Sequence, residues 1–241
     1  MSERFYSRES LAIGPASLKG DEALHLARVM RAQVGDEVIM FDGSGAEFVA
    51  RVGAIGRGRV ELDVRERREI DRELRVRLTL AVALPRGERQ RWLVEKATEL
   101  GVAELVPIIT ERGVARPGDN AIERMRRAVI EASKQCGRNR LMKISPPVEV
   151  CESWTSAPRE ALRWIAHPSV ETHSSHTIAE RLNAARGADH VIAAIGPEGG
   201  FAPREVEAAL SAGWRLIDLG RRTLRVETAA AVIAAIVGTL E

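Results

Sequence analysis

A glycine-rich segment near the carboxyl end of the chain has the residue types of a ligand-binding loop. The segment IGPEGGF, residues 195–201, follows an apolar run and precedes a stretch with helical periodicity. Its glycines leave backbone N–H and C=O groups uncovered, and Pro197 stiffens the turn before a ligand arrives. Glu198 at its centre would repel a phosphate, and the chain has neither a GK[ST] signature nor a GxGxxG fingerprint at its first strand–helix turn. A cation without phosphate, such as S-adenosylmethionine, fits better; a tight turn with a surface glutamate is the alternative.

A second loop of the same kind, LGRRTLRVET, occupies residues 219–228. It comes after the apolar stretch RLIDLG and leads into the final apolar segment of the chain. In an open α/β sheet, ligands bind just beyond the carboxyl ends of the strands, where both loops are expected. The two loops together therefore predict one shared site.

The elements that must position these loops alternate along residues 77–241. Short apolar segments typical of buried strands lie at 77–84, 105–109, 161–167, 190–196 and 215–220. Helical periodicity is expected at 89–101, 122–137, 176–187, 203–213 and 229–240. Such alternation predicts a parallel sheet that helices cover on both faces.

The first 70 or so residues have a different pattern. Apolar and polar residues alternate in VIMF, EFVARV and RVELDV, with the turn sequences DGSG and GRG between them, which predicts a small β-rich module. One helix is expected over residues 21–32, with Leu24, Ala27, Val29 and Met30 near one face. The highly charged segment 65–77 has little apolar content, and we place the domain boundary there.

The composition is that of a soluble globular protein, with 45% hydrophobic and 29% charged residues and a formal net charge of +2. Only four of the 36 basic residues are lysine. Arginine binds phosphates and bases well, although codon bias is the simpler explanation. Two cysteines, Cys136 and Cys151, provide no disulfide framework, which indicates a reducing cytoplasm. The N-terminus lacks the apolar core of a signal peptide, and the longest apolar run, residues 229–240, is too short to span a bilayer, so no membrane partner is expected.

Six motifs in order resemble one known family almost from end to end. They are RFY at the start, HLARVMRAQVGDEVIMFDG (25–43), KATELGVAELVPIITER (96–112), EASKQCGR (131–138), IGPEGGF (195–201) and LGRRTLRVETA (219–229). The sequence resembles the 16S ribosomal RNA uridine N3-methyltransferases, the RsmE-like branch of the SPOUT (trefoil-knot) methyltransferases.

This resemblance implies an α/β fold in two domains. Residues 1–72 would form a PUA-like β-barrel that binds RNA, and residues 73–241 a trefoil-knotted methyltransferase domain whose second glycine loop is threaded through the first. It also implies a homodimer with residues 229–240 at the interface. The implied activity is S-adenosylmethionine-dependent methylation of N3 of a specific uridine in 16S ribosomal RNA of the small ribosomal subunit. Two alternatives are a SPOUT enzyme acting on transfer RNA or a ribose 2′-OH, and a non-catalytic RNA-binding knot protein.

The resemblance also implies roles for individual residues. The cofactor-binding residues would be His167, Ile195, Gly196, Pro197, Gly199, Gly200, Leu219, Gly220, Leu224 and Arg225. A strand-end histidine such as His167 is more often a surface residue with its bonds satisfied.

The expected catalytic residues are Arg225, Glu198 and the partner subunit's Arg138. An arginine would stabilise charge on the uracil oxygens, and Glu198 would orient the cofactor or accept a proton. An ion pair that closes the loop is an equal alternative for Glu198, and Glu227 is a second carboxylate candidate.

The expected RNA-binding residues are Arg4, His25, Arg28, Arg31, Arg86 and Arg138, although an exposed helix arginine is usually just solvated. No metal ion is expected, because HSSH (residues 173–176) has no cysteine partner and makes a poor zinc site.

Overall fold

The computed structural model describes residues 4–167 and 187–239. The chain divides into two compact units. The first unit comprises Met1–Glu73 with Ile130–Leu141, and the second comprises Leu74–Val129 with Met142–Glu241. The expected domains, 1–72 and 73–241, remain a prediction. The structure groups residues 130–141 with the N-terminal residues.

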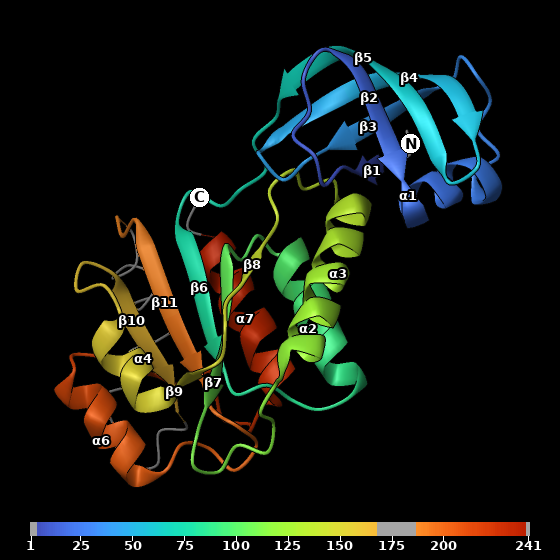
Figure 1. The fold of residues 1–241 in the computed structure, drawn as a ribbon. Helices are drawn as coiled ribbons and strands as arrows, with labels where there is room; N and C mark the ends of the chain where they lie inside the picture. The colour runs from blue at the N-terminus through green and yellow to red at the C-terminus, as the bar shows by residue number, and fades with distance from the viewer. Residues whose placement is uncertain (1–3, 168–186, 240–241) are drawn as a thin grey trace. The chain divides into compact units, whose positions relative to one another are not determined.

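The first unit is built on a five-stranded sheet, in which β1 is parallel to β3 and the other neighbours are antiparallel (Figure 1). In the order β1-β3-β4-β5-β2, the strands are β1 (Arg4–Tyr6), β3 (Glu37–Phe41), β4 (Ala46–Gly56), β5 (Arg59–Glu69) and β2 (Gly14–Lys19). Val60, Leu62 and Val64 of β5 are buried while the residues between them are more exposed, so the sequence alternation becomes one core face. Two register shifts between β4 and β5 allow these long strands to bend.

The helix expected in the first unit buries different side chains from those predicted. A short α1 (Gly20–Leu24) continues as a π-helix, η1 (His25–Val29), in which the Met30 N–H donates to the His25 carbonyl at 3.0 Å. This wider turn rotates the side chains, so Ala23 and Leu26 face the core and Val29 is 68% exposed. The prediction that Leu24, Val29 and Met30 form the apolar face was wrong.

The second unit contains a parallel sheet in the order β12-β10-β11-β6-β7-β8, with β9 also paired to β7, among the described residues. Its strands are β6 (Arg77–Val82), β7 (Glu104–Ile109), β8 (Lys143–Ile144), β9 (Val148–Glu149), β10 (Leu162–Ala166), β11 (His190–Ile195) and β12 (Arg215–Ile217). Leu78 to Val82 of β6 and Val191 to Ile195 of β11 are buried without a break. This pattern fits strands that are covered on both faces, as the sequence predicted.

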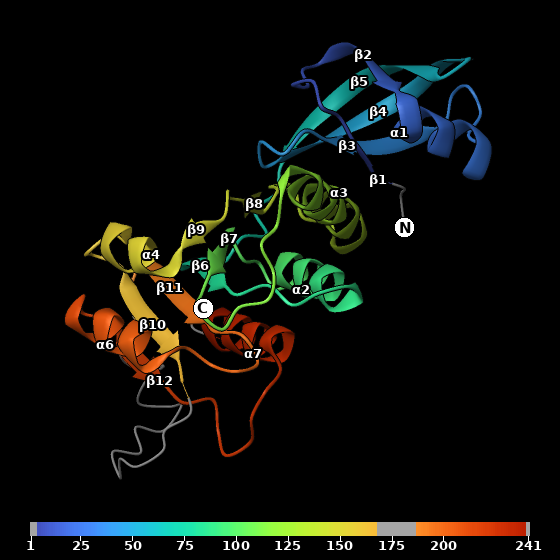
Figure 2. The ribbon, with the colours of Figure 1, turned by 60° about the horizontal axis from the view of Figure 1, so that its bottom comes forward.

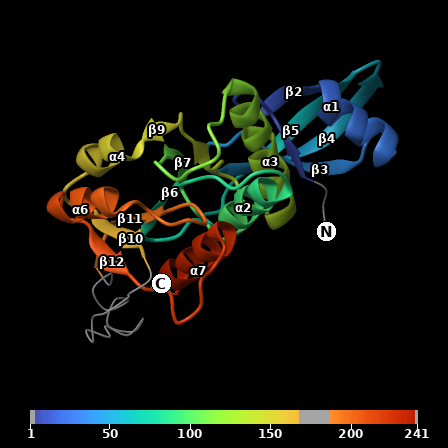
Figure 3. The same cartoon turned by 90° about the horizontal axis from the view of Figure 1, so that it is seen from below.

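Helices cover both faces of this sheet (Figures 2 and 3). The helices α4 (Val150–Ser156) and α6 (Pro203–Ser211) lie on one side, and α2 (Glu88–Glu99) and α7 (Val226–Gly238) lie on the other. The long helix α3 (Asp119–Cys136) begins in the second unit, and its residues from Ile130 onward are grouped with the first. Within the residues that the structure describes, no helix combines the length and apolarity needed to cross a membrane.

The strand order places three chain segments side by side at one edge of the sheet. Because β10 lies between β11 and β12 and all three are parallel, their carboxyl ends meet. The loops after β11 and β12 are the two glycine loops, and α7 then returns to pack on β6 and β11. The expected threading of one loop through the other remains a prediction.

Candidate functional site

A cavity of about 640 Å³ lies beyond the carboxyl ends of β10, β11 and β12. It is lined by residues 195–201 from the loop after β11, hereafter the first loop, and by residues 217–224 from the loop after β12, the second loop. The remaining lining residues are Arg112, Ala166, His167, Val226 and Ala229. The structure therefore brings the two glycine loops together at one site.

The first loop is held in a defined shape by its own residues. The Gly200 N–H donates to the Pro197 carbonyl at 2.8 Å, and Gly200 has φ of +68°, which favours glycine. A Cβ atom on Gly196 would lie 3.0 Å from the Phe201 ring and 3.1 Å from the Phe201 nitrogen. Phe201 is buried with its ring edge-on to Trp154. A side chain at residue 196 would therefore clash with Phe201 and displace the first loop.

A third loop, which follows β7, supports the first loop. The buried Glu205 carboxylate accepts the Ala202 N–H at 2.7 Å and the Glu111 N–H at 2.8 Å, so it caps α6 and joins the two loops. Arg112 donates from Nη1 to the Gly199 carbonyl at 2.9 Å. Sequence analysis missed Glu205 and Arg112. The spacing of Pro203 at the helix start and Glu205 two residues later is a capping signal that would have found the first of them.

Glu198 is ion-paired across the first loop. Its Oε1 lies 2.8 Å from Nη1 of Arg89, in the first turn of α2, and both side chains are more than 40% exposed. Glu198 also lines the cavity. A pair this exposed contributes at most about 1 kcal/mol to stability, so the carboxylate remains available to a ligand.

The second loop begins with a side-chain turn. Asp218 accepts the Gly220 N–H at 2.9 Å, and Gly220 has φ of +115°. Leu219 and Leu224 are half-buried and line the cavity. Arg225 is the residue before α7, where its carbonyl accepts the Ala229 N–H at 2.9 Å.

The other expected cofactor residues fall at the same cavity, with one exception. His167 follows β10, donates its backbone N–H to the Ile217 carbonyl at 3.1 Å and lines the cavity. Arg225 is exposed and is not among the lining residues. Those that line the cavity are His167, Ile195, Gly196, Pro197, Gly199, Gly200, Leu219, Gly220 and Leu224.

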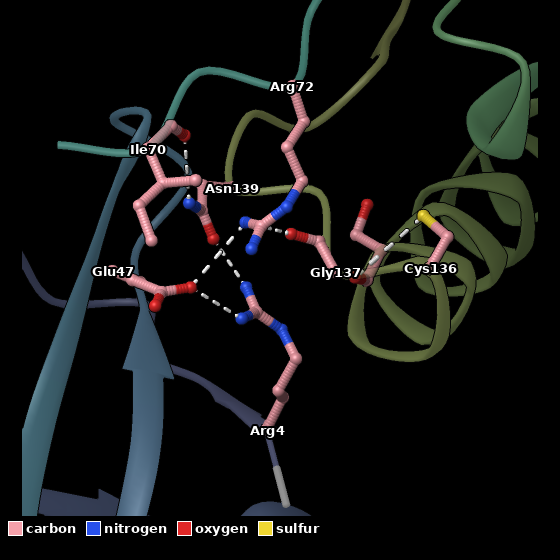
Figure 4. Close-up of polar contacts among 8 residues, drawn as sticks. Arg4, Glu47, Ile70, Arg72, Cys136, Gly137 and Asn139 are labelled. Atoms are coloured by element: carbon pink, nitrogen blue, oxygen red, sulfur yellow. Dashed lines mark hydrogen bonds and ion pairs between the residues drawn. The ribbon is translucent and has the colours of Figure 1, made fainter. Parts of the chain in front are cut away.

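Arg4 has internal partners within the first unit (Figure 4). Its guanidinium donates to Glu47 at 2.8 Å and also to the Asn139 side-chain oxygen, and it lies over the Phe41 ring. Arg72 joins the same group through Glu47 and the Gly137 carbonyl. Arg4 therefore ties β1 and β4 to the segment after α3.

Arg138 is likewise a buried, paired residue of the first unit. Its side chain is only 4% exposed, and Nε donates to Glu73 at 2.8 Å. A guanidinium in this position stabilises the packing of residues 137–139 on the N-terminal part of the chain.

The remaining arginines expected to bind RNA are at the surface. Arg28 is exposed on the π-helix and Arg31 is exposed just after it, while Arg86 is exposed and donates to the Val114 carbonyl. His25 is half-buried with its ring against Phe5.

The described ranges contain no group of three His, Cys, Asp or Glu residues placed to hold a metal ion. The HSSH segment considered in the sequence lies outside the described residues.

The chain combines a parallel α/β sheet, a cavity between two glycine loops at its strand ends and a separate β-rich unit. The chain matches the model of the RNA methyltransferase domain over residues 72–238 and that of the RNA methyltransferase PUA domain over residues 18–65. It therefore belongs to the RNA methyltransferase family that includes the ribosomal RNA small subunit methyltransferases E.

Three comparisons illustrate this membership. The chain is 31% identical to ribosomal RNA small subunit methyltransferase E of Synechocystis sp., over 90% of this chain and 70% of that protein. It is 32% identical to the protein of the same description from Mycobacterium bovis, over 93% of this chain and 86% of that one. The crystal structure of the Neisseria gonorrhoeae enzyme bound to S-adenosyl methionine superposes with a TM-score of 0.89 at 28% identity, covering 100% of this chain and 98% of that one. The expected family and the α/β fold with a PUA domain are confirmed.

Proposed function

We propose that this protein transfers a methyl group from S-adenosylmethionine to 16S ribosomal RNA of the small ribosomal subunit, at N3 of a uridine. The observation that carries the proposal is the cavity of about 640 Å³ that the two glycine loops build at the strand ends. Its size is in the usual range for sites that bind small molecules and cofactors. Family membership supports the activity and the class of substrate.

The residues at the cavity fit S-adenosylmethionine. Backbone groups of both loops face the cavity, and the half-buried Leu219 and Leu224 offer apolar surface to an adenine ring. Glu198 places a carboxylate where a cation would be favoured and a phosphate repelled. When bound, S-adenosylmethionine would supply a methyl group activated by its sulfonium charge.

The chain's own residues would act by positioning and by charge. N3 of uracil lies on the Watson–Crick edge, so the target base must be unpaired or flipped to reach the cavity. N3 must also lose its proton, which leaves negative charge on the uracil oxygens. We assign Arg225, exposed at the start of α7, to stabilise that charge. Two finer assignments remain predictions. They are Glu198 as proton acceptor or cofactor ligand, and Arg138 as a catalytic residue.

We also propose that the protein works as a cytoplasmic homodimer with α7 at the interface. Val232 and Ile236 of α7 are apolar and remain partly exposed in the single chain. This exposure supports the proposal that a second copy of the chain packs on α7. Sedimentation showing a mass of one chain at micromolar concentration would contradict this.

Methylation of small-subunit ribosomal RNA tests the function directly. The purified protein is incubated with this RNA and S-adenosylmethionine, and the digested nucleosides are identified by mass spectrometry. We expect 3-methyluridine, and about 100-fold slower single-turnover formation with Arg225→Ala because one charge-stabilising group is lost. Arg215→Ala, an exposed arginine at the other end of β12, is the matched control.

The alternatives give different products. A 2′-O-methylated nucleoside, or methylation of transfer RNA alone, would replace the proposed substrate with another RNA. Failure to bind S-adenosylmethionine in calorimetry would leave an RNA-binding protein without catalysis.

A further inference from the structure

Two consecutive arginines of the second loop, Arg221 and Arg222, line the mouth of the cavity and are exposed. Among the described residues, neither makes a hydrogen bond or an ion pair. Other arginines nearby are engaged, since Arg89 is paired with Glu198 and Arg112 donates to Gly199. Among the described residues that line the cavity, the arginines without such a partner are therefore the two of the second loop.

The charge of the cofactor does not explain these two arginines. S-adenosylmethionine carries a sulfonium and an ammonium against a single carboxylate, so two guanidinium groups at the mouth would oppose its entry more than assist it. Guanidinium groups bind phosphate oxygens through paired N–H donors. An anion with several phosphates is the ligand that suits them.

We propose that Arg221 and Arg222 bind phosphates of the RNA backbone next to the nucleotide that enters the cavity. The proposal rests on the proposed function, because it takes RNA as the substrate. It deepens that function by placing an RNA contact on the same loop that contributes Leu219 and Leu224 to the cavity.

The arginines of the first unit make this assignment more specific. Arg4 and Arg138 were expected to bind RNA, but their guanidinium groups are engaged by Glu47 and by Glu73 in buried pairs. Both guanidinium groups are largely buried, so moving either one out of its ion pair to reach a phosphate would be costly. Arg221 and Arg222 are exposed and lose no such partner on binding RNA.

The test compares two double variants with the same change of charge. Arg221→Ala with Arg222→Ala removes the proposed contacts. Arg124→Ala with Arg127→Ala is the control, because both of these arginines are exposed on α3, outside the cavity lining and without a hydrogen bond or ion pair to another described residue. Affinity for small-subunit ribosomal RNA is measured by fluorescence anisotropy across a range of salt concentrations, and affinity for S-adenosylmethionine by calorimetry.

Each lost contact with a phosphate of single-stranded RNA should reduce the slope of log affinity against log salt by about 0.7. We expect the Arg221/Arg222 variant to lose about 1.4 from the slope, with S-adenosylmethionine affinity unchanged within about twofold. The control should keep the wild-type slope. A variant with lysine at both positions should keep the slope, since it keeps the charge. A variant with glutamine at both positions removes the charge as alanine does, should lose the same amount of slope, and serves as the test if the alanine variant fails to fold.

Two results would overturn the inference. An unchanged slope with weaker S-adenosylmethionine binding would mean that the arginines hold the cofactor carboxylate. An equal loss of slope in the control would mean that only overall charge matters. If the wild-type protein methylates ribosomal RNA in either case, the proposed function stands and this inference alone fails; if it does not, the function itself is wrong.

Discussion

Replacing Glu205 by alanine tests how the first loop is held in shape. Glu205 is buried, with only 3% of the residue exposed. One oxygen accepts the N–H of Ala202, itself a buried residue, and the other accepts the N–H of Glu111, which lies in an exposed loop. Loss of the bond to Ala202 should therefore lower the free energy of unfolding more than loss of the bond to Glu111.

The magnitude follows from this difference in burial. A hydrogen bond to a charged group contributes about 1.5–3 kcal/mol, and the Ala202 N–H would lose it with no water to replace the acceptor. The Glu111 N–H can be hydrated in part, so its loss should cost about 0.5–1.5 kcal/mol. We expect Glu205→Ala to lower the free energy of unfolding by about 2–4 kcal/mol. Glu205→Gln keeps one acceptor for Ala202 and should cost about 1 kcal/mol.

Urea unfolding of both variants measures these differences, and calorimetry with S-adenosylmethionine reports on the loop. Because Glu205 joins the first loop to the loop after β7, its loss should also weaken S-adenosylmethionine binding. Glu207→Ala is the matched control, since Glu207 is exposed on the same helix, and should lie within about 0.5 kcal/mol of wild type. If Glu205→Ala were as stable as that control, or if Glu205→Gln were as damaging as Glu205→Ala, the reasoning would be refuted.

Three further predictions concern the first loop and the dependence of stability on pH. Gly196→Ala should weaken S-adenosylmethionine binding about tenfold or more, because the added Cβ meets the Phe201 backbone, whereas Gly118→Ala, with open space around its Cβ, should bind normally in the same calorimetry. Burial holds the pKa of His190 below its ordinary value of about 6.5, and the charge of Arg77 lowers it further. The folded state thus binds this proton less readily than the unfolded state, so stability should fall as pH drops through about 6.5, and His190→Gln should flatten that decline in thermal melts from pH 7 to 5. Burial alone would raise the pKa of Glu104, but its bonds with Lys143 and Ser145 hold it below about 4.5, so a second loss of stability should appear below that pH, and Glu104→Gln should remove it. An unchanged pH profile in either variant would contradict the corresponding assignment.

Much of the second unit was predicted from the sequence because its signals are local. The apolar strands expected at 77–84, 161–167 and 190–196 appear as β6, β10 and β11, shorter by one or two residues. The helix expected at 203–213 begins at Pro203 as α6. The final helix begins at Val226 rather than 229, because the polar residues of its first turn concealed the start. Periodicity depends on neighbours a few residues apart, so it can be recognised without the fold.

The π-helix shows where local reasoning fails within one element. The apolar residues of 21–32 are compatible with an α-helix, but the Met30-to-His25 bond skips an extra residue and turns a different face to the core. Which face is buried depends on the sheet beneath it, and Leu26 is buried there while Val29 is exposed. The sheet's surface is assembled from strands distant in the chain.

The sequence by itself determined that two glycine loops follow apolar strands, that the chain has two architectures, and which family it resembles. Only the tertiary structure decided that Arg4 and Arg138 are occupied by Glu47 and Glu73, since those partners lie 43 and 65 residues away. It also decided that Arg221 and Arg222 stand at the mouth of the cavity. The role of an arginine depends on which carboxylate it pairs with. Its neighbours in sequence do not specify a partner so far along the chain, so the pairing is decided only when the chain folds.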